Sequence, residues 1–209
     1  MRQSRRGFMR IAASAGISSL VMFEAPFAWA DQIDYDVPGE FAILKQKGDT
    51  CWATAGTMMY NWRKGTTYSV DDLTQMAGDP YAGAYSQKKS LTISDTAGWI
   101  SFLGLKADPP ASYPPSAIRD MLKKRGLLWA TTLSSAQNCI FSLHARILRG
   151  IHGDDASLNL TTLTIIDPAT GTSWPVSINQ FYKDFEGFAK SENTCDPDEP
   201  LLPQILHFP

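Results

Sequence analysis

The chemistry open to this 209-residue chain is limited by its three cysteines and three histidines. Cys51 stands where the sequence predicts the start of a helix, and the free backbone N–H groups at such a start stabilise a thiolate. A thiolate is a good nucleophile, and a neighbouring base is needed to form it. His144 is the candidate base, because it opens a predicted strand that would hold its imidazole rigidly. The pattern therefore predicts nucleophilic catalysis by a Cys–His pair.

Asp167 is the candidate partner for the other nitrogen of the imidazole. A base of this kind needs an acceptor that orients the ring, and Asp167 ends the next predicted strand. If the strands over residues 144–151 and 160–166 pair through a turn at 153–155, their ends lie side by side. His144 and Asp167 would then be neighbours in space, although they are far apart in the chain.

Gln46 completes the set of candidate catalytic residues. It precedes Cys51 by five residues. A side-chain amide at this place could donate a hydrogen bond to the oxyanion of a tetrahedral intermediate, together with the backbone N–H of Cys51.

Other kinds of site lack their sequence signatures. The chain has no CxxC pair, no GxGxxG or P-loop, no CxxCH and no HExxH, so we expect no metal and no cofactor. Its nearly even charge, −2 formally, disfavours a nucleic-acid partner, which would require a surplus of Lys and Arg. A peptide or protein substrate is the partner that fits a Cys–His site.

The first thirty residues are typical of an export signal. A basic head, Ser4-Arg5-Arg6-Gly7-Phe8-Met9-Arg10, resembles the bacterial twin-arginine motif. A short apolar stretch over 11–23 and the end Ala28-Trp29-Ala30 complete a signal peptide that would be cleaved after Ala30. We therefore expect a catalytic domain over 31–209 with a charge of −5, located in the periplasm or secreted, without stable membrane insertion. A Sec-type signal or an uncleaved anchor is the alternative.

The order of predicted elements indicates an α+β fold. Helices come first, and antiparallel strands follow them, which is typical of segregated α+β domains. The tail over 190–209 holds four prolines and is expected to be mostly irregular. The predicted helices cover residues 51–64, 70–77, 95–103, 114–124 and 178–186, and the predicted strands cover 127–133, 144–151 and 160–166.

These motifs together resemble the papain-like cysteine peptidases, and in particular small secreted bacterial members. The resemblance rests on Gln46, on Cys51-Trp52-Ala53 at a helix start, on His144-Ala145 leading into Gly150, and on Ile166-Asp167-Pro168, which follow one another in the family order. It implies a helical part with the nucleophile and an antiparallel sheet part. It also implies a Cys51–His144–Asp167 triad, with Gln46 at the oxyanion, that hydrolyses peptide bonds through a thioester. Papain itself has asparagine in place of the aspartate.

Less specific interpretations remain open for each of these residues. Cys51 could be a buried structural cysteine, His144 a core histidine, Asp167 a turn former before a proline, and Gln46 a surface residue. The same triad could also serve a transferase or a deamidase, and the same fold could serve as a silent binding module. The two other cysteines, Cys139 and Cys195, could form a disulfide after export or stay unpaired.

Overall fold

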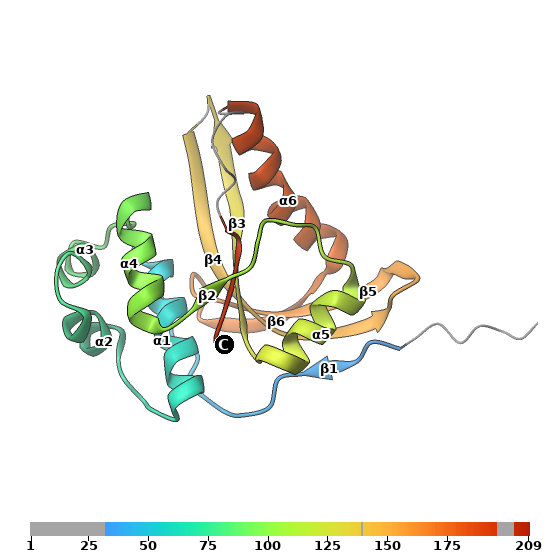
Figure 1. Ribbon diagram of the computed structural model, residues 1–209, viewed down its shortest axis with the longest axis horizontal. Coiled ribbons are helices and arrows are strands. Elements are labelled where there is room, and N and C mark those ends of the chain that lie inside the picture. The colour runs from blue at the N-terminus through green and yellow to red at the C-terminus, as the bar shows by residue number, and fades with distance from the viewer. Residues whose placement is uncertain (1–31, 139, 196–202) are drawn as a thin grey trace, which may run out of the picture.

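The computed structural model describes residues 32–138, 140–195 and 203–209, and it has helices first in the chain and a sheet after them. Helices α1 to α4 lie on one side, and the sheet with α6 lies on the other (Figure 1). The predicted mixture of helix and antiparallel sheet is confirmed. The helices are α1 (Cys51–Lys64), α2 (Val70–Ala77), α3 (Tyr81–Ser86), α4 (Ile93–Leu103), α5 (Pro115–Arg125) and α6 (Ile178–Cys195). The strands are β1 (Tyr35–Asp36), β2 (Lys106–Ala107), β3 (Leu128–Gln137), β4 (Ile140–Asp154), β5 (Ser157–Asp167), β6 (Thr172–Ser177) and β7 (Ile205–His207).

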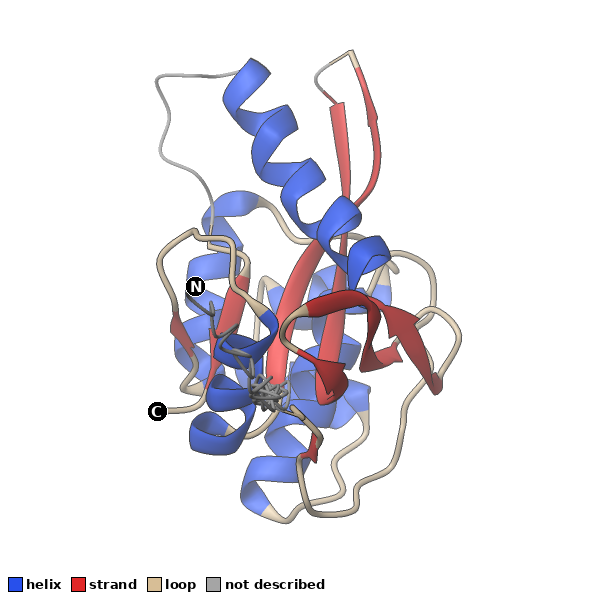
Figure 2. Cartoon of the chain, turned by 90° about the vertical axis from the view of Figure 1, so that its right-hand side faces the viewer, coloured by secondary structure: helices blue, strands red, loops and turns tan. Residues whose placement is uncertain are grey.

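The sheet is antiparallel between all of its described strands, in the order β2-β7-β3-β4-β5-β6, with β1 added on β4. Strand β4 is central, because β3 pairs with its first half and β5 with its second half. Figure 2 shows α6 running beside the long β3–β4 hairpin, against which it packs. The pairing of β4 with β5 is the one that the sequence predicts for His144 and Asp167.

Helix α1 is the buried centre of the helical half. Nine of its residues are buried, so it contacts neighbours on nearly all sides rather than along one stripe. Gly56 lets α4 approach closely, since an added Cβ would lie 2.8 Å from side-chain atoms of both Leu103 and Trp99. Gly65 ends the helix in the left-handed conformation, φ 63°, as predicted. This tight packing fixes the position of the first turn of α1, which begins at Cys51.

Several elements differ from the sequence-based expectations. Strand β4 begins at Ile140, so His144 lies within this strand and does not open it, because the β3–β4 hairpin extends well beyond the apolar run. Helix α3 and strand β6 were not expected from the sequence pattern. Both are short, six residues each, and α3 follows directly after a proline.

The expectation of an irregular tail over 190–209 is wrong for most of its described part. Helix α6 continues to Cys195, and β7 pairs on both sides, with β2 and with β3. Ile205, Leu206 and Phe208 are each only 3% exposed. The tail therefore supplies an interior strand of the sheet, and its pairing partners, distant in sequence, give no local signal.

Two expectations fall on residues outside the described part of the chain. The predicted leader over 1–30 is one of them. The possible disulfide is the other, because Cys139 lies outside the described residues. Within the described residues, no helix combines the length and the apolar character that crossing a bilayer requires.

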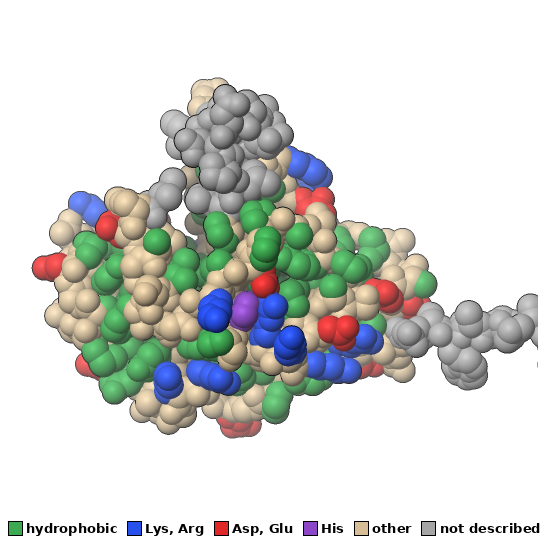
Figure 3. Space-filling view, in the orientation of Figure 1, with side chains coloured by type: hydrophobic (Ala, Val, Ile, Leu, Met, Phe, Trp, Pro, Cys, Tyr) green, Lys and Arg blue, Asp and Glu red, His purple; other side chains and the backbone are tan. Residues whose placement is uncertain are grey.

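Basic side chains gather on the face shown in Figure 3 around α5, whose last turn holds Lys123, Lys124 and Arg125. Positive charge at this end of a helix complements the negative end of the helix dipole. This basic cluster therefore has a structural explanation that requires no ligand.

The buried tail leads to a prediction about stability. We expect Leu206→Ala to lower the free energy of unfolding by about 2–5 kcal/mol, because it removes a buried side chain from an interior strand. Urea denaturation measures this change. The matched control is Leu160→Ala. Because Leu160 is 71% exposed, this variant should unfold like wild type. Equal, small effects of the two substitutions would show that the tail is not part of the folded sheet.

Candidate active site

Cys51 is the first residue of α1, and the structure leaves the start of this helix without a side-chain cap. Thr50 occupies the N-cap position, but its hydroxyl bonds to the backbone of Lys47 instead, donating to the carbonyl at 3.1 Å. Threonine often caps helices, but no side-chain hydrogen bond caps this one. The backbone N–H groups of the first turn stay available beside the Cys51 thiol, which is partly exposed.

The residue after Cys51 anchors this turn in the helical half. Trp52 donates its indole N–H to the carbonyl of Lys89 at 3.0 Å, and its ring packs edge-on against Trp99 with centroids 5.0 Å apart. Trp99 in turn donates to the carbonyl of Trp52 at 3.3 Å. The backbone next to the thiol is held from two directions, so Cys51 has a defined position.

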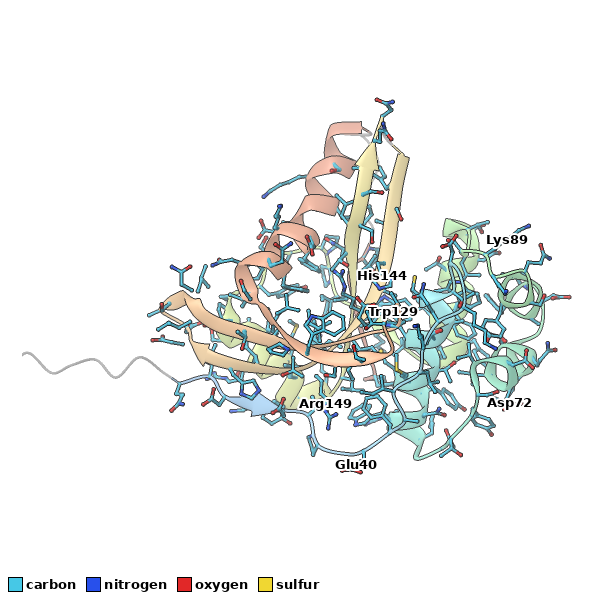
Figure 4. The ribbon with its side chains drawn as sticks, turned by 180° about the vertical axis from the view of Figure 1, so that it is seen from behind. Glu40, Asp72, Lys89, Trp129, His144 and Arg149 are labelled. Carbon is cyan, nitrogen blue, oxygen red and sulfur yellow. The ribbon has the colours of Figure 1, made fainter. Side chains whose placement is uncertain are left out.

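His144 and Asp167 are in direct contact. The distance from His144 Nε2 to Asp167 Oδ1 is 2.6 Å, and both side chains are largely buried. Figure 4 shows His144 at the place where the sheet meets α1. The contact follows from the register of β4 on β5, in which Ile147 pairs with Ile166. The neighbourhood that the sequence predicts for these two residues is thus present.

Asp167 has further partners that fix the orientation of its carboxylate. Oδ1 also accepts the backbone N–H of Ala169 at 2.8 Å, and Oδ2 accepts Nε–H of Arg146 at 3.2 Å. Arg146 also donates through Nη1 to the hydroxyl of Thr132 at 2.9 Å. That hydroxyl donates to the backbone carbonyl of His144 at 3.2 Å. The carboxylate is therefore held on both oxygens.

The pKa values of the pair are shifted in opposite directions. Burial would lower the pKa of His144, but its hydrogen bonds to Asp167 and Cys51 and the charges of these partners raise it to about 9. Burial would raise the pKa of Asp167, but its bonds to His144, Ala169 and Arg146 and the charge of His144 lower it to about 2. Across the neutral range the pair is therefore an imidazolium and a carboxylate.

The same pKa shift connects the two halves of the site. Cys51 is among the groups whose hydrogen bonding and charge raise the pKa of His144, so the thiol lies near the imidazole. Since Nε2 of the ring bonds to Asp167, Nδ1 is the nitrogen left to face Cys51. The three side chains thus come from α1, β4 and β5, with His144 bonded to Asp167 and Cys51 nearby.

Gln46 lies beside these three residues, and its side-chain amide already makes one hydrogen bond. Its backbone N–H donates to the carbonyl of Pro168 at 2.8 Å, which ties it to the segment after Asp167. Its side-chain Nε2 donates to the carbonyl of Gly48 at 2.6 Å, and Oε1 is buried without a partner among the described residues. One N–H of the amide remains for another acceptor.

The two other histidines lie away from this site. His152 is 41% exposed in its side chain and contacts Asp34 and Asp36 of the β1 region. His207 is 7% exposed, lies in β7, and faces Asp108 at 3.5 Å, so it is part of the sheet rather than of an irregular tail. Among the described residues, no three His, Cys, Asp or Glu side chains are grouped as a metal site.

Sequence reasoning missed Arg146 and Thr132. Arg146 follows His144 by two residues on β4, so its side chain points to the same face of the sheet. A charged residue two positions after His144 is the signal that could have indicated it. The hydroxyl of Thr132, which lies opposite His144 on β3, has no comparable signal.

A family model described as papain-like cysteine protease AvrRpt2 matches residues 31–186, which is well over half of the chain. The chain therefore belongs to this family of papain-like cysteine proteases. A search of curated proteins gave no match. The family implies peptidase activity and a peptide or protein substrate.

The pKa shifts predict how the His144–Asp167 pair affects stability. The pKa of Asp167 is lowered from 3.8 to about 2, so its contribution is present above pH 3.8 and is lost as the pH falls through 2. The pKa of His144 is raised from 6.5 to about 9, so its contribution is full below pH 6.5 and is lost as the pH rises through 9.

We therefore expect the difference in unfolding free energy between wild type and His144→Ala to be largest from about pH 4 to pH 6.5. Urea denaturation of both proteins over the acidic to alkaline range measures it. A difference that does not change with pH would mean that the pair is not ionised in the folded protein.

Proposed function

We propose that the chain is an exported cysteine peptidase that hydrolyses peptide bonds with Cys51 as nucleophile, His144 as base and acid, and Asp167 as the residue that orients the imidazole. The observation that carries this proposal is the position of His144. Its ring bonds to Asp167 at 2.6 Å through Nε2, while the thiol of Cys51, at an uncapped helix start, is the partner left for Nδ1.

In the proposed acylation step, His144 holds the proton of the Cys51 thiol. The sulfur then forms a bond to the substrate carbonyl carbon, and the carbonyl π electrons move onto its oxygen. When the tetrahedral intermediate collapses, the C–N bond breaks and His144 gives its proton to the leaving amine. The raised pKa of His144, about 9, keeps this proton available at neutral pH.

In the proposed deacylation step, water attacks the thioester. His144 takes a proton from the water as its oxygen bonds to the acyl carbon, and the C–S bond breaks to release the acid and the Cys51 thiolate. Asp167 stays ionised throughout, because its pKa of about 2 is far below that of the imidazolium. Its role is to keep the ring in place and to stabilise the imidazolium charge.

The oxyanion of both intermediates is assigned to backbone and amide donors. The N–H of Cys51 is one, since Cys51 is the first residue of α1 and its N–H has no acceptor within the helix. The remaining N–H of the Gln46 amide is the second, because its other N–H is held by Gly48. The bond to Gly48 fixes the orientation of the amide in advance, and preorganised donors of this kind lower the barrier most.

A transferase or deamidase remains the alternative enzyme. The acyl-enzyme is the same, and only the acceptor or the scissile nitrogen differs, which the triad does not determine. A silent binding module is the alternative outside enzymes. The bond of His144 to Asp167, with Cys51 nearby, argues against it, because a binding surface does not need a buried His–Asp pair beside a cysteine.

Selective alkylation tests the proposed nucleophile. Folded protein is treated with limiting iodoacetamide near neutral pH, and the label is mapped by mass spectrometry. We expect Cys51 to react first and His144→Ala to slow this reaction by at least about tenfold, since it removes the group that holds the thiol proton. His152→Ala is the matched control, because His152 lies on the same strand and pairs with Asp34 and Asp36.

A rate at Cys51 no faster than that of a free cysteine would refute the proposed function. If Cys51 is activated, incubation of a peptide library with wild type and with Cys51→Ala distinguishes the three candidate activities. New peptide ends indicate a peptidase, ligated peptides a transferase, and released ammonia a deamidase.

Export is supported by the leader pattern over residues 1–30. We propose that the mature chain begins at Asp31 and is located in the periplasm or outside the cell. Sequencing of the N-terminus of the exported chain should find Asp31 first. Retention of residues 1–30 on the exported protein would contradict this proposal.

A further inference from the structure

We propose that Arg146 is a positioning residue of the triad, which holds the Asp167 carboxylate so that Oδ1 faces His144. This inference rests on the proposed function, because positioning matters only if His144 works on Cys51. The hydrogen bonds and ion pairs of Arg146 go to Asp167, Thr132 and Asp184, so it acts on His144 through these partners. The family description assigns no role to this residue.

The contacts of Arg146 converge on the two groups that place the imidazole. Its Nε–H bonds to Oδ2 of Asp167 at 3.2 Å, the oxygen that His144 does not use. Its Nη1 bonds at 2.9 Å to the hydroxyl of Thr132, which donates to the backbone carbonyl of His144. One guanidinium thus connects the carboxylate that holds the ring with the hydroxyl that holds its backbone, and a planar group with several donors is suited to this.

The register of the sheet makes this arrangement possible. Ile147 pairs with Ile166, so the next position outward puts Arg146 opposite Asp167. Residues directly opposite on neighbouring antiparallel strands are close enough to pair. His144 lies two residues further along β4 on the same face, and it reaches Asp167 diagonally. A single carboxylate is therefore shared between two cationic side chains from one strand.

The charges explain why such a residue is needed with an aspartate. A buried carboxylate is costly unless its charge is paired and its oxygens are bonded. The side chain of Asp167 is only 7% exposed, and that of Arg146 is 22% exposed. His144 bonds to only one oxygen of this carboxylate. The bond from Arg146 to the other oxygen is among the causes that lower the pKa of Asp167. Without Arg146, Asp167 would have one poorly bonded oxygen and more freedom to turn away.

Arg146 also has a partner on α6, which suggests a purely structural alternative. Its Nη1 lies 3.5 Å from Oδ2 of Asp184, whose side chain is 27% exposed. In this alternative the arginine only connects the helix to the sheet. The alternative predicts that Arg146 and Asp184 matter equally, and that they matter for stability alone. Positioning predicts that Arg146 matters far more, and for catalysis.

Three variants separate these possibilities. Arg146→Met removes the charge and the hydrogen bonds, Arg146→Lys keeps the charge but not the fork of donors, and Asp184→Asn removes only the connection to α6. Arg149→Met is the matched control on the same strand, since Arg149 contacts the carbonyl of Gly39 and the ring of Phe41. Steady-state kinetics with a peptide substrate from the library digest gives kcat, KM and their pH profiles.

We expect Arg146→Met to lower kcat by about 10- to 100-fold, the range for one hydrogen bond to a charged group, with KM changed less than about threefold. The acid limb of its pH–activity profile should also move to higher pH, because Asp167 loses a neighbouring cation that lowers its pKa. Arg146→Lys should restore the position of the acid limb and part of kcat. Asp184→Asn and Arg149→Met should keep the wild-type pH profile.

A wild-type kcat and pH profile in Arg146→Met would overturn the inference, and so would equal losses in Arg146→Met and Asp184→Asn. A second measurement does not depend on activity. The proton between His144 Nε2 and Asp167 Oδ1 gives a far-downfield NMR signal, which Arg146→Met should shift or broaden and Arg149→Met should not. If wild-type Cys51 is unreactive, the proposed function fails, but an unchanged NMR signal in Arg146→Met is what overturns the role of Arg146.

Discussion

The hydrogen bond between His144 and Asp167 depends on one register, that of β4 on β5. A shift by one residue would turn every side chain of a strand to the opposite face of the sheet. The buried residues Ile147, Leu148, Ile165 and Ile166 pair in the observed register, which puts Asp167 on the same face as His144 and Arg146. The core of the sheet therefore determines the geometry of the polar pair at its edge.

The second constraint is the docking of α1 against β4, which brings the thiol to the imidazole. Helix α1 is buried on nearly all sides, and the indoles of Trp52 and Trp99 fasten its first turn. The start of the helix is left uncapped, at a cost of about 0.5–2 kcal/mol for a missing cap. The hydroxyl of Thr50 donates to the carbonyl of Lys47 instead. The first turn of α1 is therefore less stable than a capped one, and its N–H groups stay free beside the Cys51 thiol.

Elements with local signals could be predicted from the sequence. The end of α1 at Gly65 and the capping box of Ser69 and Asp72 in α2 are set by neighbouring residues. The contact between His144 and Asp167 was also predictable, since it needs only a hairpin between adjacent strands. These features depend on few residues, and those residues are close in the chain or joined by a short turn.

The remaining features depend on distant partners. Strand β7 is three residues long, and it exists because β2 and β3 pair with it on both sides. The role of Thr132 depends on a neighbour across the strand. Strand β4 carries two arginines, Arg146 and Arg149, and only the register of β5 places Arg146 beside Asp167. Periodicity cannot show contacts of this kind, because they are properties of the assembled sheet.

The central claim is that Cys51, activated by His144, forms an acyl-enzyme. Intact-mass spectrometry of the protein, quenched with acid shortly after mixing with a small activated ester, tests it most directly. We expect one acyl group on Cys51, bound as a thioester that hydroxylamine removes. It should form more slowly in His144→Ala, and in wild type it should be hydrolysed over time. Acylation spread equally over Cys51, Cys139 and Cys195, or no acyl group on Cys51, would contradict it.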